Sequence, residues 1–85
     1  MNDAQILTYL QSHAPLDRFY LFMPRGGDEV LMKYLDASGR SWNIMEDDDE
    51  TVAQAVAFLK RSGVQVFDDY AALLKFEEGA GRRPD

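Results

Sequence analysis

Apolar positions recur along this chain with two different periods, and each period predicts a different kind of element. The clearest helical pattern repeats at positions i, i+3, i+4 and i+7, at Val52, Ala55, Val56 and Leu59. It predicts a central helix over 50–62, with Gly63 placed to end it in the left-handed conformation. A narrower stripe predicts an N-terminal helix over 3–13, which Asn2 and Gln5 can open as a capping box.

Short runs rich in aromatic and β-branched residues lie between these two helices. They are separated by turn residues and predict an antiparallel meander of strands at about 18–24, 29–36 and 40–45. Farther along, 64–67 predicts a short fourth strand that could pair with an edge of the meander, and 69–78 predicts a C-terminal helix capped by Asp68. The sequence therefore predicts an α+β fold in a single domain over 1–79, followed by a mobile tail at 80–85.

The turn between the second and third strands predicts how their side chains are arranged. Gly39 suits the left-handed bulge position of a three-residue hairpin loop, so Asp36 should lie opposite Arg40. Alternation then places one set of residues on the core face of the sheet, namely Met32, Tyr34, Trp42 and Ile44. The opposite face mixes apolar and polar residues, namely Leu31, Lys33, Leu35, Ser41, Asn43 and Met45. We call it the half-apolar face.

The composition narrows the classes of function. Fifteen Asp and Glu residues against nine Lys and Arg residues give a formal net charge of -6, which opposes binding to nucleic acid. Cysteine is absent and His13 is the one histidine, so disulfides, thiolate nucleophiles and zinc sites are not expected. The chain shows neither a signal peptide nor an apolar run that could span a membrane, and we expect a cytoplasmic protein.

The most prominent polar feature is the acidic run before the central helix, Glu46, Asp47, Asp48, Asp49 and Glu50. Negative charge stabilises a helix N-terminus, so a helix cap is the simplest interpretation, with a partner-binding patch or a Mg²⁺ or Ca²⁺ site as alternatives. A calcium loop of the EF-hand type is excluded, because counting from Asp47 puts Val52 at the glycine position and Phe58 at the glutamate position. Asp68 and Asp69 begin the last helix and could join the same acidic patch.

Other candidate features have simpler structural explanations. Arg25, Gly26 and Gly27 lack the lysine and hydroxyl of a phosphate-binding loop and fit a hairpin turn. His13 has no serine or carboxylate at a recognisable catalytic spacing. The aromatic residues of the strands have few cations beside them, so they suit a core better than a surface for stacking bases.

We therefore expect a non-catalytic protein-binding module or regulator, without a cofactor or a metal. Its partner would be another protein, basic if the acidic patch binds it, or a second copy of the chain. The half-apolar face would supply the alternative binding or dimer surface, with Leu31, Lys33, Leu35 and Met45. If the N-terminal helix covers that face and the two later helices cover the core face, the protein is an ordinary monomer. The alternative functions are an inhibitor or immunity-type protein that mimics nucleic acid, and a carboxylate-dependent enzyme or enzyme subunit.

Overall fold

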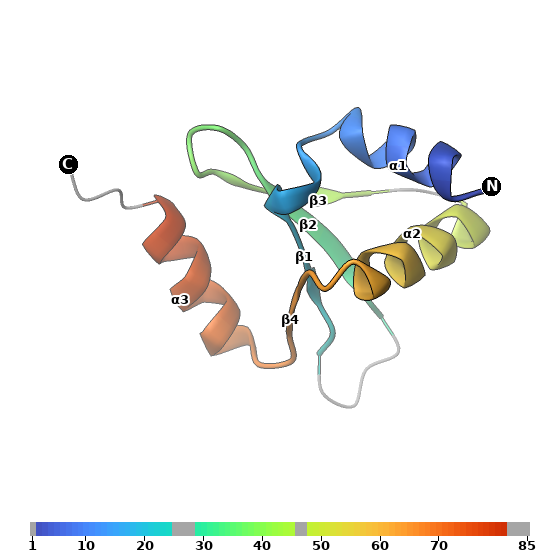
Figure 1. The fold of residues 1–85 in the computed structure, drawn as a ribbon. Helices are drawn as coiled ribbons and strands as arrows, with labels where there is room; N and C mark the ends of the chain where they lie inside the picture. Colours follow the sequence, from blue (N-terminus) through green and yellow to red (C-terminus); the bar gives the residue numbers. More distant parts are fainter. Residues whose placement is uncertain (1, 25–28, 46–47, 82–85) are drawn as a thin grey trace.

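The computed structural model describes residues 2–24, 29–45 and 48–81. Along this part of the chain the elements are, in order, α1 (Asp3–Gln11), the single 3-10 turn η1 (Leu16–Arg18), β1 (Phe19–Phe22), β2 (Leu31–Leu35), β3 (Ser41–Ile44), α2 (Asp49–Arg61), β4 (Gln65–Phe67) and α3 (Tyr70–Gly81) (Figure 1). The order and the types of these elements confirm the predicted α+β class.

The described strands form one mixed sheet in the order β3-β2-β1-β4. β1, β2 and β3 pair antiparallel, as predicted, while β4 lies parallel to β1. A parallel partner needs a long connection, and α2 supplies one by crossing from the end of β3 to the start of β4. The predicted fourth strand is therefore confirmed, and it pairs with the β1 edge of the meander.

The pairing of β2 with β3 has the predicted register, with Tyr34 opposite Trp42 and Met32 opposite Ile44. Met32 and Ile44 are buried, as expected for the core face. The expectation is wrong for Trp42, whose side chain is 43% exposed. β3 is an edge strand of the sheet, so no neighbouring strand covers the outer side of this large residue.

Asp36 organises the turn that sets this register. Its N–H donates to the carbonyl oxygen of Arg40 at 3.0 Å, and Gly39 takes the left-handed conformation with a φ of 86°, both as predicted. Its carboxylate accepts hydrogen bonds from the Ser38 hydroxyl at 2.6 Å, the Ser38 N–H at 2.9 Å and the Trp42 indole N–H at 2.9 Å. These donors favour the ionised form and hold the pKa of the Asp36 carboxyl well below its ordinary value.

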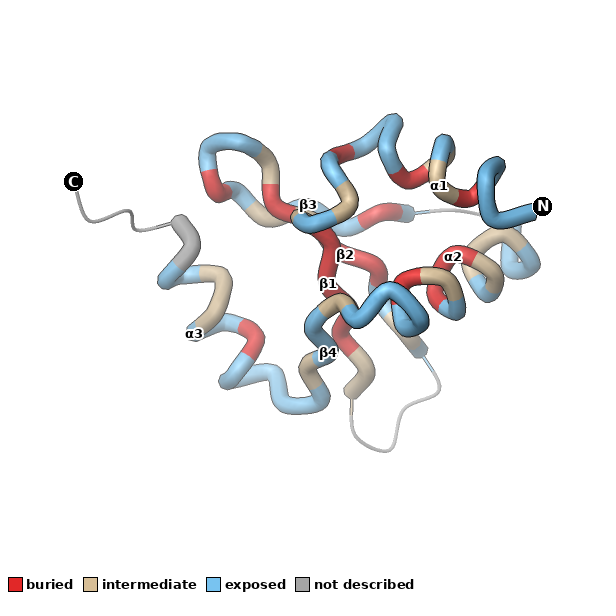
Figure 2. The backbone as a smooth tube through the Cα atoms, viewed as in Figure 1, coloured by how far each residue is buried: buried red, intermediate tan, exposed pale blue. Residues whose placement is uncertain are grey.

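α1 and α2 lie on the same face of the sheet and bury the larger core with it (Figure 1). Figure 2 shows the buried segments along the strands and along the inner sides of these helices. The buried residues are Ile6, Leu10, Ala14, Phe19, Leu21, Met32, Ile44, Ala55, Val56 and Leu59. The predicted alternative in which the N-terminal helix covers the half-apolar face is therefore wrong. α1 itself buries only Ile6 and Leu10, a stripe too narrow to cover a sheet face, and it shares the core face with α2.

α3 packs on the half-apolar face, on the opposite side of the sheet from α1 and α2 (Figure 1). Leu73 is buried there, and the ring of Phe76 lies 5.1 Å from the ring of Tyr20 and 5.0 Å from that of Phe67. This second, smaller cluster consists of Tyr20, Phe22, Leu35 and Leu73, with Phe67 and Phe76 partly buried against it. The sheet is thus covered on both faces, by two helices on one and by α3 on the other.

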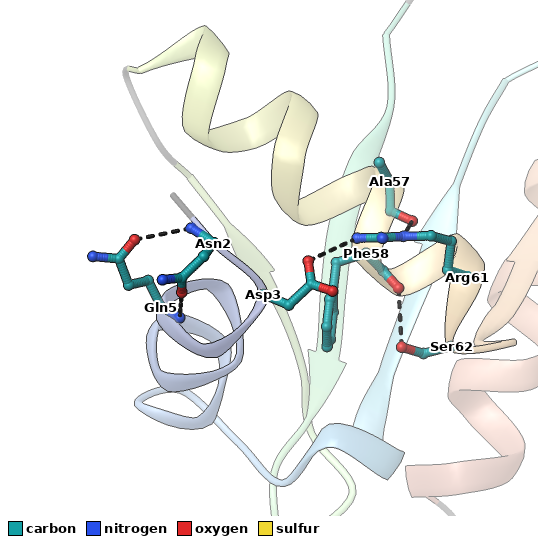
Figure 3. Close-up of polar contacts among 7 residues, drawn as sticks. All are labelled: Asn2, Asp3, Gln5, Ala57, Phe58, Arg61 and Ser62. Atoms are coloured by element: carbon teal, nitrogen blue, oxygen red, sulfur yellow. Dashed lines mark hydrogen bonds and ion pairs between the residues drawn. The ribbon is translucent and has the colours of Figure 1, made fainter.

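Figure 3 shows how α1 begins and how it is joined to α2. The N–H of Asn2 donates to the side-chain oxygen of Gln5 at 2.9 Å, and the N–H of Gln5 donates to that of Asn2 at 2.9 Å, which confirms the capping box. The guanidinium of Arg61, in the last turn of α2, lies 3.2 Å from the carboxylate of Asp3. Both side chains are exposed, so this ion pair contributes little to stability.

The start and the end of α3 differ from the prediction. Its cap is Asp69 and not Asp68, because the carboxylate of Asp69 accepts from the N–H of Ala71 at 3.2 Å and its carbonyl accepts from the N–H of Leu73 at 3.0 Å. The helix continues to Gly81, so the backbone of the first two residues of the predicted tail is helical. The remainder of that tail, 82–85, lies outside the described residues.

Candidate functional site

α3 divides the half-apolar face into a covered part and an open part. Lys33 and Leu35, which were expected on a binding surface, are 9% and 8% exposed because α3 packs over them. The prediction that these two residues lie on an exposed binding surface is therefore wrong, because both are in the interior. Leu31 and Met45, from the same expected surface, remain exposed.

A polar network beneath α3 joins that helix to the sheet. The hydroxyl of Tyr20 donates to the carboxylate of Glu77 at 2.5 Å, and the ammonium of Lys33 lies 3.2 Å from the same carboxylate oxygen. Lys33 also donates to the side-chain oxygen of Asn43 at 2.6 Å. The hydroxyl of Tyr20 and the ammonium of Lys33 thus each have an acceptor, which is the condition for tolerating such groups in a core.

The Tyr20 hydroxyl remains a neutral donor within this network. Burial raises its pKa well above the ordinary value, and the hydrogen bond to the negatively charged Glu77 raises it further. A hydrogen bond with Ser41 acts in the opposite direction but is the smallest of these effects. A phenol held in this way stays un-ionised at neutral pH, and its hydrogen bond to Glu77 ties β1 to α3.

Four large apolar side chains remain exposed on α3 and at the end of the sheet where β2 begins and β3 finishes. They are Leu31, Met45, Tyr70 and Leu74, which are 38%, 87%, 60% and 39% exposed, and we call them the apolar patch. Phe22 connects them, because it lies opposite Leu31 in the β1–β2 ladder and its ring is 6.0 Å from that of Tyr70. Leu74 follows Tyr70 by one helical turn, and Met45 directly follows the last residue of β3.

The carboxylates that were expected to form an acidic patch lie at the end of the sheet where β1, β3 and β4 finish. These three strands run in the same direction, so α2 and α3 both begin at that end. The exposed carboxylates are Asp48, Asp49 and Glu50 at the start of α2 and Asp68 and Asp69 at the start of α3, while Glu46 and Asp47 lie outside the described residues. Figure 1 shows the two helix starts well apart, because β3 and β4 are opposite edges of the sheet. The described carboxylates therefore form two groups.

Asp48 is the N-cap of α2, which confirms the helix-cap interpretation for this residue. Its carboxylate accepts from the Thr51 hydroxyl at 2.5 Å and from the Glu50 N–H at 3.2 Å. These two donors, the hydroxyl first, lower the pKa of the Asp48 carboxyl. Among the described carboxylates of the run, Asp48 caps the helix, and Asp49 and Glu50 add exposed charge in its first turn.

The described residues bring no group of metal-binding side chains together. His13 is exposed, and its ring lies 5.4 Å from that of Tyr9 and 6.1 Å from that of Tyr34. Within the described ranges no three His, Asp or Glu side chains are placed to hold a metal ion. In the same part of the chain, no helix has both the length and the apolar character needed to cross a membrane.

A cleft of about 830 Å³ opens at the other end of the half-apolar face, where β1 and β4 begin. Its lining includes Arg18 from η1, Tyr20 from β1, Leu35 from β2, Gln65 from β4 and Phe76 from α3. The sequence contains no signal for this cleft, because its walls come from segments throughout the chain.

Sequence reasoning also missed the network beneath α3. A lysine between two leucines on the half-apolar face, and a glutamate one turn after Leu73, were the available signals for a buried charge pair. They did not identify the partners, since Tyr20 and Glu77 are 57 positions apart and meet only in the folded chain. No family model, curated protein or solved structure matches this chain, so its function is argued from its own residues.

Proposed function

We propose that this chain is a protein-binding module without catalytic activity, which binds a basic segment of another protein through the apolar patch. The observation that carries the proposal is the exposure of four large apolar side chains, two of them on α3 and two near the end of the sheet where α3 begins. Single exposed apolar residues are normal, but here the exposed ring of Tyr70 lies against Phe22, which pairs with the exposed Leu31, and such a group favours an interaction site. A partner that covers this group removes apolar surface from water, which is the main driving force of association.

The charges beside the patch favour a basic partner. Exposed carboxylates stand next to patch residues in the chain, with Glu29 two positions before Leu31 and Asp69 directly before Tyr70. A segment with apolar side chains flanked by Lys or Arg would bury the patch and approach these carboxylates. Such charge complementarity speeds association at low salt and disfavours acidic competitors.

The alternative of an inhibitor or immunity-type protein that mimics nucleic acid has less support. Mimicry needs closely spaced negative charges over one surface, whereas the described carboxylates fall into two groups at opposite edges of the sheet. A carboxylate-dependent enzyme also has less support. Its carboxylates would have to meet in a cleft that gives them different pKa values, and the described groups stand at separate helix starts.

Affinity capture with matched variants tests the proposal. The immobilised chain is offered a lysate of its source organism, in parallel with the double variant Tyr70→Ser/Leu74→Ser and the control Val66→Ser. Val66 is 45% exposed but lies on β4 outside the patch, so the control removes a comparable apolar side chain elsewhere. Captured proteins are then purified, and their Kd values are measured by calorimetry.

The expected partner is basic and binds the wild type and Val66→Ser alike, but binds the double variant at least about tenfold more weakly. Its affinity should also fall when the salt concentration rises from about 0.05 to about 0.5 M, because screening weakens the attraction between charges. A partner that binds the double variant as tightly as the wild type contradicts the choice of surface. A dimer in light scattering that the double substitution dissociates would instead make the patch a self-association interface.

We also propose that the protein is located in the cytoplasm, as expected for a chain without cysteine. Cell fractionation followed by immunoblotting tests this part, and recovery of the protein from the medium or from an oxidising compartment would contradict it.

A further inference from the structure

The cleft at the beginning of β1 and β4 is separate from the apolar patch, which lies where these strands end. Its volume of about 830 Å³ lies within the range of roughly 300 to 1,000 Å³ that is typical of small-molecule sites. Phe76 of α3 lines one side and Arg18 of η1 another, and Tyr20 and Leu35 line it from the sheet. The cleft therefore combines apolar walls with a charged group, as ligand sites commonly do.

Arg18 is the cation that lines this cleft among the described residues. It is half-buried, and it ends η1 directly before β1. Lys33 is paired with Glu77 and Arg61 with Asp3, whereas no ion pair or hydrogen bond joins the Arg18 guanidinium to any described residue. A partly desolvated guanidinium in a cleft favours an anionic ligand group, because a carboxylate can accept two parallel hydrogen bonds from it.

The remaining side chains of the cleft favour an apolar body on that ligand. The ring of Phe76 and the side chain of Leu35 belong to the smaller core cluster and also line the cleft. The hydroxyl of Tyr20 is bonded to Glu77, so this buried residue offers no free donor to the cleft. The amide of Gln65 supplies a neutral polar group at the start of β4.

We propose that this cleft binds a small carboxylate with an apolar or aromatic body. The carboxylate pairs with Arg18, and the body lies between Phe76 and Leu35. A doubly charged phosphate suits the cleft less well, because the exposed carboxylate of Asp17 lines it too and the chain carries a net charge of -6. A ligand in this position touches both the sheet and α3, so binding also stabilises the packing of that helix.

An NMR titration of the isotope-labelled whole chain tests the assignment with three probes, phenylpropionate, phenylpropanol and phenylpropylamine. The probes share one aromatic body and differ in charge. Phenylpropionate is expected to shift the backbone amide signals of Arg18, Gln65 and Phe76 and to bind at least about tenfold more tightly than phenylpropanol. Arg18→Gln should abolish that advantage, whereas Arg61→Gln, which removes an exposed cation outside the cleft, should keep it.

Several results would overturn the assignment. They are equal binding of the acid and the alcohol, tighter binding of the amine, shifts confined to residues outside the cleft, and no shift at about 10 mM probe, where even a millimolar Kd gives a signal. Tighter binding of inorganic phosphate than of phenylpropionate would also overturn the carboxylate class. The comparison of probes uses the wild-type chain, so it decides the outcome even if Arg18→Gln does not fold.

Discussion

The ion pair between Lys33 and Glu77 holds α3 against the sheet, and a double-mutant cycle measures its contribution. Lys33→Met removes the cation and keeps most of the side-chain volume. Glu77→Gln removes the anion but keeps an oxygen that can accept the hydrogen bond of the Tyr20 hydroxyl. The double variant removes both charges together, so it leaves neither one unpaired in the interior.

The magnitude follows from how far the pair is desolvated. The side chains of Lys33 and Glu77 are 11% and 15% exposed. Removing one partner of a fully buried pair costs about 3 to 5 kcal/mol, because the other charge remains buried. Here Asn43 still accepts from Lys33 and Tyr20 still donates to Glu77, so we expect each single variant to lose about 2 kcal/mol in free energy of unfolding. With a loss of about 1 kcal/mol in the double variant, the coupling energy is about 3 kcal/mol.

Urea unfolding at neutral pH, followed by far-UV circular dichroism, measures these losses. A domain of this length has a total stability of about 4 to 13 kcal/mol, so a loss of about 2 kcal/mol shifts the midpoint clearly. The exposed pair of Asp3 and Arg61 provides the control, because Asp3→Asn and Arg61→Gln should show a coupling below about 0.5 kcal/mol. If the coupling of Lys33 with Glu77 is as small as that of the control, the reasoning about α3 is refuted.

Four further predictions concern the core, one helix end and the pH dependence of stability. Leu59→Ala removes a fully buried side chain of α2 and should cost about 2 to 5 kcal/mol in urea unfolding; a loss below about 1 kcal/mol would contradict the packing of α2 on the sheet. Gly63 has a φ of 79° with no atom within 4 Å of a Cβ position, so in the same assay Gly63→Ala should cost about 1 kcal/mol from backbone strain alone and Gly63→Asn distinctly less. The pKa of the Tyr20 hydroxyl is raised by burial and by Glu77, so the folded state keeps its proton longer than the unfolded chain; stability should fall as the pH rises above about 10, and less steeply in Tyr20→Phe. The pKa of the Asp36 carboxyl is lowered, so its contribution is present above about pH 4 and is lost as the pH falls further; urea midpoints measured against pH should show an acid-side decline that Asp36→Asn reduces.

The parts of this fold that depend on neighbouring residues were predictable from the sequence. The period of the apolar positions in α2 places Ala55, Val56 and Leu59 on one helix face, and all three are buried. The hairpin register follows from the left-handed Gly39, and the start of α1 follows from the spacing of Asn2 and Gln5. In each case the residues that interact lie within a few positions of one another, so their spacing in the chain determines their geometry.

The candidate sites depend on residues that are far apart in the chain, and the sequence alone did not predict them. Alternation placed Leu31, Lys33 and Leu35 together on one sheet face, but only the packing of α3 decided that Lys33 and Leu35 are buried and Leu31 is partly open. The same packing paired Glu77 with Lys33 and shaped the cleft beside Arg18.

The acidic run shows the same division between local and tertiary information. Its sequence predicted a helix cap, and Asp48 provides that cap through contacts within its own helical turn. Whether its charges meet those of Asp68 and Asp69 depended on the strand order, which puts the two helix starts at opposite edges of the sheet. The sequence by itself thus determined the elements and their local ends, because short-range geometry is set by spacing along the chain. Only the tertiary structure decided which surfaces are covered, because that depends on how faces formed by distant segments fit together.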